Sequence, residues 1–107
     1  MGYNSEFEDV MDNINNIAQG YGFKNGIDWA NEAQKREVIS WSQYKKFENA
    51  HNLRVRFSHG NARDINVSYE TYQVAKEFEK EIENSSIKKN RYGDNNKKNG
   101  EGKKAWQ

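Results

Sequence analysis

The last 24 residues of the chain, 84–107, limit most strongly what it can fold into. They contain seven lysines or arginines against two acidic residues, and apart from glycine only two aliphatic and two aromatic side chains. A segment of this composition buries too little apolar surface to offset the entropy that it loses on ordering. We therefore expect residues 84–107 to form a disordered basic tail, and residues 1–83 to form the one folded domain.

The composition excludes several classes of protein. Cysteine is absent, which excludes disulfides, thiolate zinc sites and cysteine nucleophiles. The mean hydropathy is -1.26, and no apolar run approaches the roughly 18 residues of a membrane-spanning helix. We see no signal peptide and expect a cytoplasmic protein. The two histidines, His51 and His59, lack helical i, i+4 spacing, so we expect no metal site and no cofactor.

Helices are the expected secondary structure, because proline, which breaks them, is absent. In the first segment Ser5 and Glu8 form a Ser-x-x-Glu capping box, and Gly20 and Gly22 offer left-handed stops. The apolar residues of this segment recur at helical spacing. They are Phe7, Val10, Met11, Ile14, Ile17 and Ala18.

Three more helices follow. The second is short, is capped by Asp28 and runs to about Val38, and the third begins near Ser40 or Ser42. The apolar residues of the third recur about every 3.2 residues, so this helix either breaks around residues 50–52 or is buried on more than one side. Ser68 caps the fourth helix. The inward residues of the fourth helix are Thr71, Ala75, Phe78 and Ile82, with Val74 at the margin. These patterns predict an all-α fold, a small four-helix bundle.

A homodimer is the expected assembly. About 83 residues, in a chain of which only 34% are hydrophobic, give a thin core, and a dimer buries more surface. Large aromatic residues such as Trp29, Trp41 and Tyr44 are expected in the core or in the dimer contact.

A short motif follows in the third helix. Leu53-Arg54 is followed by four residues and then by His59-Gly60. This arrangement resembles the signature of the HEPN family of small helical bundles, in which an arginine precedes a histidine by four to six residues. The resemblance implies a metal-independent endoribonuclease in which Arg54 and His59 are catalytic and paired motifs of two protomers line one cleft.

The chemistry of the two residues agrees with that implication. Histidine, with an ordinary pKa of about 6.5, can give or take a proton near neutral pH, and the forked donors of arginine match phosphate oxygens. On a straight helix Arg54 and His59 lie about 140° apart around the axis and ~7.5 Å apart along it, so they share a face poorly. A bend near the helix end, or a second subunit, can bring such groups together. Arg56 and Arg63 are candidates for binding a nucleic-acid backbone.

Two functions stay open. One is a HEPN-like metal-independent endoribonuclease of a toxin–antitoxin or phage-defence system, with RNA as its partner. The other is a non-catalytic HEPN-like binding protein with a protein partner, either an antitoxin or a phage or mobile-element inhibitor of a host or defence enzyme. Val55 favours the second, because the family commonly has a polar residue directly after the arginine. Arg54 can equally pair with an acidic residue on a neighbouring helix, and His59 can serve as a helix C-terminal residue.

Overall fold

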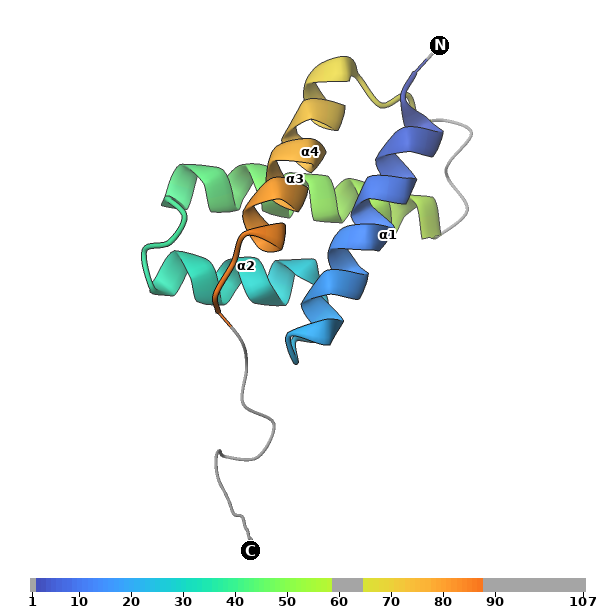
Figure 1. Cartoon of the computed structure of the whole chain (residues 1–107). Coiled ribbons are helices and arrows are strands. Elements are labelled where there is room, and N and C mark those ends of the chain that lie inside the picture. The colour runs from blue at the N-terminus through green and yellow to red at the C-terminus, as the bar shows by residue number, and fades with distance from the viewer. Residues whose placement is uncertain (1, 59–64, 88–107) are drawn as a thin grey trace, which may run out of the picture.

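The computed structural model describes residues 2–58 and 65–87 (Figure 1). Within these ranges the chain forms helices and no strand, so the predicted small all-α bundle is confirmed. None of these helices is long and apolar enough to cross a membrane. The helices are α1 (Asn4–Gly20), α2 (Gly26–Lys35), α3 (Trp41–Ser58) and α4 (Tyr69–Glu83).

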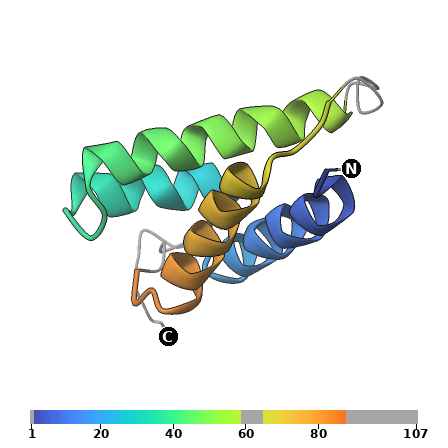
Figure 2. The same ribbon diagram turned by 90° about the horizontal axis from the view of Figure 1, so that it is seen from above.

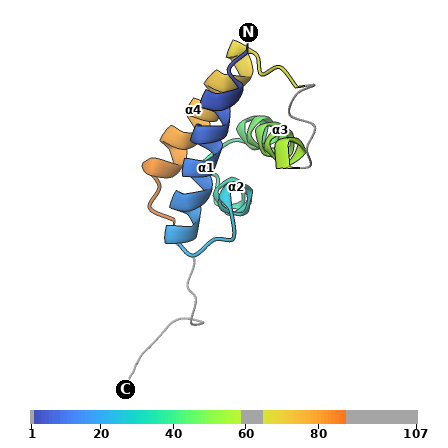
Figure 3. The same cartoon turned by 90° about the vertical axis from the view of Figure 1, so that its right-hand side faces the viewer.

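The four helices are arranged in two crossing pairs. α1 and α4 lie side by side, and the antiparallel α2 and α3 pack across them (Figure 2). Figure 3 views α2 and α3 nearly end-on while α1 and α4 run along the picture. This crossing brings α4 against α1 and α3, and the Phe78 ring of α4 also reaches Trp29 of α2, so the core forms there.

Aromatic rings fill that core. The ring of Phe78, on α4, stacks on the ring of Phe47 from α3 at a centroid distance of 4.4 Å, and lies 6.2 Å from that of Trp29 on α2. All three side chains are fully buried. The inward face predicted for α4 is confirmed at Ala75, Phe78 and Ile82, whereas Thr71 is half-buried.

The predicted capping box of α1 is wrong. The helix begins at Asn4, its N-cap Tyr3 makes no side-chain cap bond, and Ser5 is exposed inside the first turn. The Asn4 side chain instead donates to the carbonyl of Ile65 at 2.7 Å and accepts from the backbone N–H of Val67 at 2.8 Å. A long-range contact with the segment before α4 therefore fixes the start of α1.

Two helices end in the same backbone geometry. After α1 the N–H of Gly22 donates to the carbonyl of Gln19, and the N–H of Phe23 donates to that of Ala18. This Schellman motif places Gly22 at φ 96°, so the left-handed stop is Gly22, and Gly20 is the last helical residue. α2 ends with the same two bonds, but its left-handed residue is Glu37, at φ 63°.

Replacing Glu37 by glycine is expected to raise the free energy of unfolding by about 1 kcal/mol, because a side chain at a left-handed position costs roughly 1–2 kcal/mol that glycine avoids. Urea unfolding measures the change. Glu37→Ala is the control, since alanine keeps the Cβ and gains nothing. An equal gain from both substitutions would contradict this explanation.

The cap of α2 also differs from the prediction. Asn25, and not Asp28, is the N-cap: its side-chain oxygen accepts from the backbone N–H of Asp28 at 2.9 Å. The helix ends at Lys35, three residues before the expected Val38. The predicted cap of α4 is confirmed, because the Ser68 hydroxyl accepts from the N–H of Thr71 at 3.1 Å.

The third helix is continuous, so the break considered around residues 50–52 is absent. Ser40 and Gln43 form a reciprocal capping box before it, with bonds of 2.9 and 3.0 Å. Trp41, which begins the apolar pattern of this helix, does not belong to the inward face and is 61% exposed. The buried residues of the helix are Phe47, Ala50 and Phe57.

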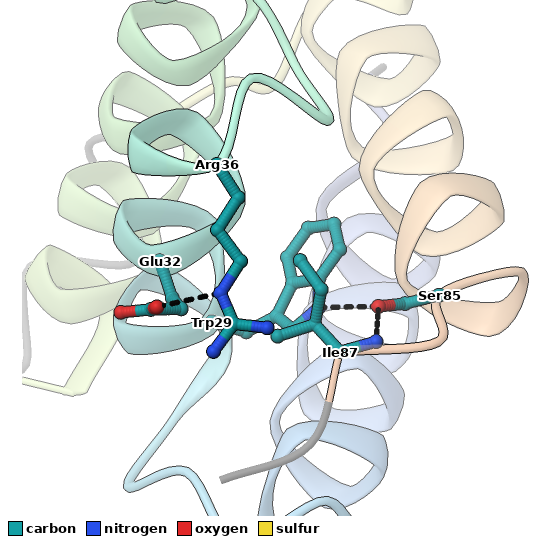
Figure 4. A network of polar contacts seen from close by, with 5 residues as sticks. All are labelled: Trp29, Glu32, Arg36, Ser85 and Ile87. Atoms are coloured by element: carbon teal, nitrogen blue, oxygen red, sulfur yellow. Dashed lines mark hydrogen bonds and ion pairs between the residues drawn. The ribbon is translucent and has the colours of Figure 1, made fainter.

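The packed part of the chain extends beyond the expected boundary at residue 83. The Ser85 hydroxyl accepts from the indole N–H of Trp29 at 2.8 Å and from the backbone N–H of Ile87 at 3.0 Å (Figure 4). The Ile87 side chain is only 4% exposed. The first residues of the expected tail therefore cover Trp29, and residues 88–107 lie outside the described part of the chain.

Candidate functional site

Arg54 is bound to two carboxylates of α1. It lies on α3, seven residues after Phe47 and four residues after Ala50, both of which are buried. Its own side chain is 22% exposed. Its Nε and Nη2 atoms lie 3.2 and 2.9 Å from Oδ1 of Asp12, and its Nη1 lies 3.7 Å from Oε2 of Glu8. Glu8 and Asp12 are one turn apart on α1, so both point to the same guanidinium.

This arrangement determines the charge that a ligand meets at Arg54. One guanidinium stands beside two carboxylates, so the cluster of Glu8, Asp12 and Arg54 carries a net charge of about -1 when all three are ionised. A phosphate oxygen would have to displace Asp12 and to approach Glu8. Of the roles expected for Arg54, the structure contains the ion pair with an acidic residue on a neighbouring helix.

The other predicted site residues divide into two groups. His59 and Arg63 lie outside the described residues, and so does the predicted pairing of Arg54 with His59. Arg56 is described, and it does not share the environment of Arg54. It lines a groove on the α4 side of α3.

That groove, which we call the α3–α4 groove, has a volume of about 390 Å³. Half-buried or buried side chains form its base, and exposed amide and cationic side chains form its rim. The base consists of Ala50, Leu53, Thr71 and Val74, and the rim consists of Lys46, Asn49, Asn52 and Arg56.

The rim is positive on an otherwise acidic body. α3 contains four basic residues and one acidic residue, whereas α1 contains four acidic residues and no basic one. Two of the cations of α3 are already paired, Lys45 with Glu48 at 2.7 Å and Arg54 with Asp12. Lys46 and Arg56 form no ion pair with any residue in 2–58 or 65–87, so both remain available to a ligand.

His51 is the one described residue with a proton-transfer group suited to neutral pH. Burial lowers the pKa of its imidazole, and the nearby charge of Glu48 offsets part of that effect. His51 is therefore mostly neutral at pH 7. It does not line the α3–α4 groove, and the described residues contain no group of three or more side chains that could hold a metal ion.

Sequence reasoning identified Arg56 and missed the rest of the groove. A signal was present, because Lys46, Asn49, Leu53 and Arg56 recur at steps of three and four and so share one face of a helix. The pattern alone does not distinguish a solvated face from a groove. The distinction requires α4, which supplies Thr71 and Val74 to the base of the groove.

No protein-family model, no curated protein and no solved structure matches this chain. The HEPN resemblance therefore depends on the sequence pattern alone, and residues 59 and 60 of its motif are outside the described part of the chain.

Proposed function

We propose that this protein is a non-catalytic, HEPN-like binding protein that acts on a protein partner. The observation that carries the proposal is the contact of Arg54 with Asp12 and Glu8. The HEPN-type reaction needs an arginine on the phosphate and a histidine at the scissile bond. An arginine that joins α3 to two carboxylates of α1 is suited to holding the bundle together.

The surface for the partner is the α3–α4 groove. It combines a largely apolar base with amides and with cations that form no ion pair with a described residue, which is the mixed chemistry of a protein-binding site. In the setting that the HEPN resemblance implies, such a protein is an antitoxin, or a phage or mobile-element inhibitor of a host or defence enzyme, in the cytoplasm.

A HEPN-like endoribonuclease is the second candidate, and one observation favours it. α3 runs unbroken to Ser58 and carries Arg54 and Arg56 within its last five residues, directly before His59 in the sequence. In the sequence, two arginines therefore precede a residue able to transfer protons by no more than five positions.

A homodimer is part of the proposal. Trp41 and Val38, at the corner between α2 and α3, are 61% and 51% exposed. Large apolar side chains left in solvent at one corner are suited to a contact between two copies.

Cleavage of RNA in the presence of EDTA separates the two candidates. The purified full chain is incubated with a structured RNA, and the chain carrying His59→Ala serves as the control for a contaminating nuclease. We expect no cleavage beyond that of the control. Cleavage by the unmodified chain that is lost in both His59→Ala and Arg54→Ala would overturn the binding proposal in favour of the ribonuclease.

A further inference from the structure

We infer that the α3–α4 groove binds an acidic amphipathic helix of the partner protein. The inference depends on the proposed function, because it names the partner's chemistry at the same groove. Three observations support it: the span of α3 that lines the groove, the side chains at the base of the groove, and the charge of its rim.

The span of α3 that lines the groove fits a short partner helix. Lys46 and Arg56 are ten residues apart on α3, which corresponds to about 15 Å along the helix axis. A partner helix of about ten residues, nearly three turns, spans the same distance. The base offers Leu53 and Val74 to the apolar side chains of such a helix, which recur at steps of three and four.

The charge of the rim selects an acidic helix. Lys46 and Arg56 are the first and last residues of α3 that line the groove, and they have no ion pair with a described residue. Carboxylates at both ends of a bound helix would meet one cation each. Asn49 and Asn52 lie between them and can donate to or accept from the polar side chains of the partner helix.

Other occupants fit less well. Residues 84–107 of this chain have an excess of five positive charges and are repelled by the same cations. A second copy offers acidic helices, but the apolar faces of its α1 and α4 are buried in its own core. RNA fits less well, because no aromatic side chain of the described residues lines the groove for its bases to stack on.

A library of displayed 16-residue peptides with helix-favouring sequences tests the inference on the full chain. Selected peptides are expected to be net acidic, with apolar residues at steps of three and four. Reversing the rim charges with Lys46→Glu and Arg56→Glu should weaken their binding about tenfold or more. Both side chains are exposed, so these two variants should fold normally.

Two further variants form a matched pair. Leu53→Glu places a carboxylate in the base of the groove and should abolish binding. Val55→Glu makes the same kind of change on α3 at a residue that is 38% exposed and outside the groove, and it should leave binding unchanged. Thermal melting of each variant shows that it is folded.

Each result has one meaning. Acidic amphipathic peptides that bind in a groove-dependent manner support the inference. Neutral or basic peptides that depend on the groove overturn the acidic helix and leave the proposed function standing. A uridine oligonucleotide that binds the chain and loses its binding on Arg56→Glu overturns the inference in favour of RNA. Absence of any peptide sensitive to the groove variants overturns the inference and the proposed function together.

Discussion

Replacing Phe78 by alanine is expected to lower the free energy of unfolding by about 3–5 kcal/mol, the cost of removing a buried aromatic side chain. The ring is fully buried, and it joins α4 to α3 through Phe47 and to α2 through Trp29. Because these two partner rings belong to different helices, loss of the Phe78 ring removes a contact with each helix. Urea unfolding followed by circular dichroism measures the loss.

Tyr69→Ala is the control for this substitution. Tyr69 is also aromatic and also on α4, but it is 53% exposed, so its loss should cost less than about 1 kcal/mol. A loss below about 1 kcal/mol for Phe78→Ala as well would show that the crossing of α4 over α2 and α3 does not form the core.

A chain that ends at Asn84 is expected to be less stable than the full chain by about 2–4 kcal/mol. It lacks the buried Ile87 side chain, whose loss is comparable to a core isoleucine-to-alanine change, and the hydroxyl that pairs with the Trp29 indole. The indole is then exposed to solvent on the side that Figure 4 shows covered. Thermal melting of the two chains measures the difference.

The matched chain ends at Ile87. It keeps both contacts, so it should melt within a few degrees of the full chain. Equal stability of the full chain and the chain ending at Asn84 would contradict the packing of Ser85 and Ile87, and would place the end of the folded domain at residue 83.

The helices could be predicted from the sequence wherever a single face is buried. α1 and α4 each present one apolar stripe to the core, and local spacing reports such a stripe directly. In α3 the spacing did not show that Trp41, which fits the apolar pattern, lies in solvent. Whether a tryptophan points inward or outward depends on tertiary packing, and the spacing of apolar residues along the chain gives no information on that packing.

The helix starts show the same limit. Ser68 was predicted correctly because its cap bond is local, to Thr71 three residues on. Asn4 was missed because its side chain bonds to residues 65 and 67, more than 60 positions away. Ile87 was missed because a tail with a low average hydrophobicity can still carry one side chain that docks.

For the candidate site, the sequence predicted some of the residues that belong to it but not what those residues contact. The motif identified Arg54, and the sequence left open whether it binds phosphate or a neighbouring carboxylate. The partner Asp12 is 42 residues earlier, on a helix that meets α3 only in the folded chain. The α3–α4 groove could not be predicted for the same reason, since part of its base comes from a different helix.

A double-mutant cycle between Arg54 and Asp12 tests most directly whether Arg54 is a structural residue. Arg54→Ala, Asp12→Ala and the double variant are unfolded in urea, and Arg56→Ala, combined with Asp12→Ala, is the control pair. We predict a favourable coupling of about 0.5–1 kcal/mol for Arg54 with Asp12, and additivity for Arg56 with Asp12. Additivity in both pairs, together with RNA cleavage that disappears in Arg54→Ala, would contradict the structural role of Arg54. Arg54 would then be a catalytic residue of a ribonuclease.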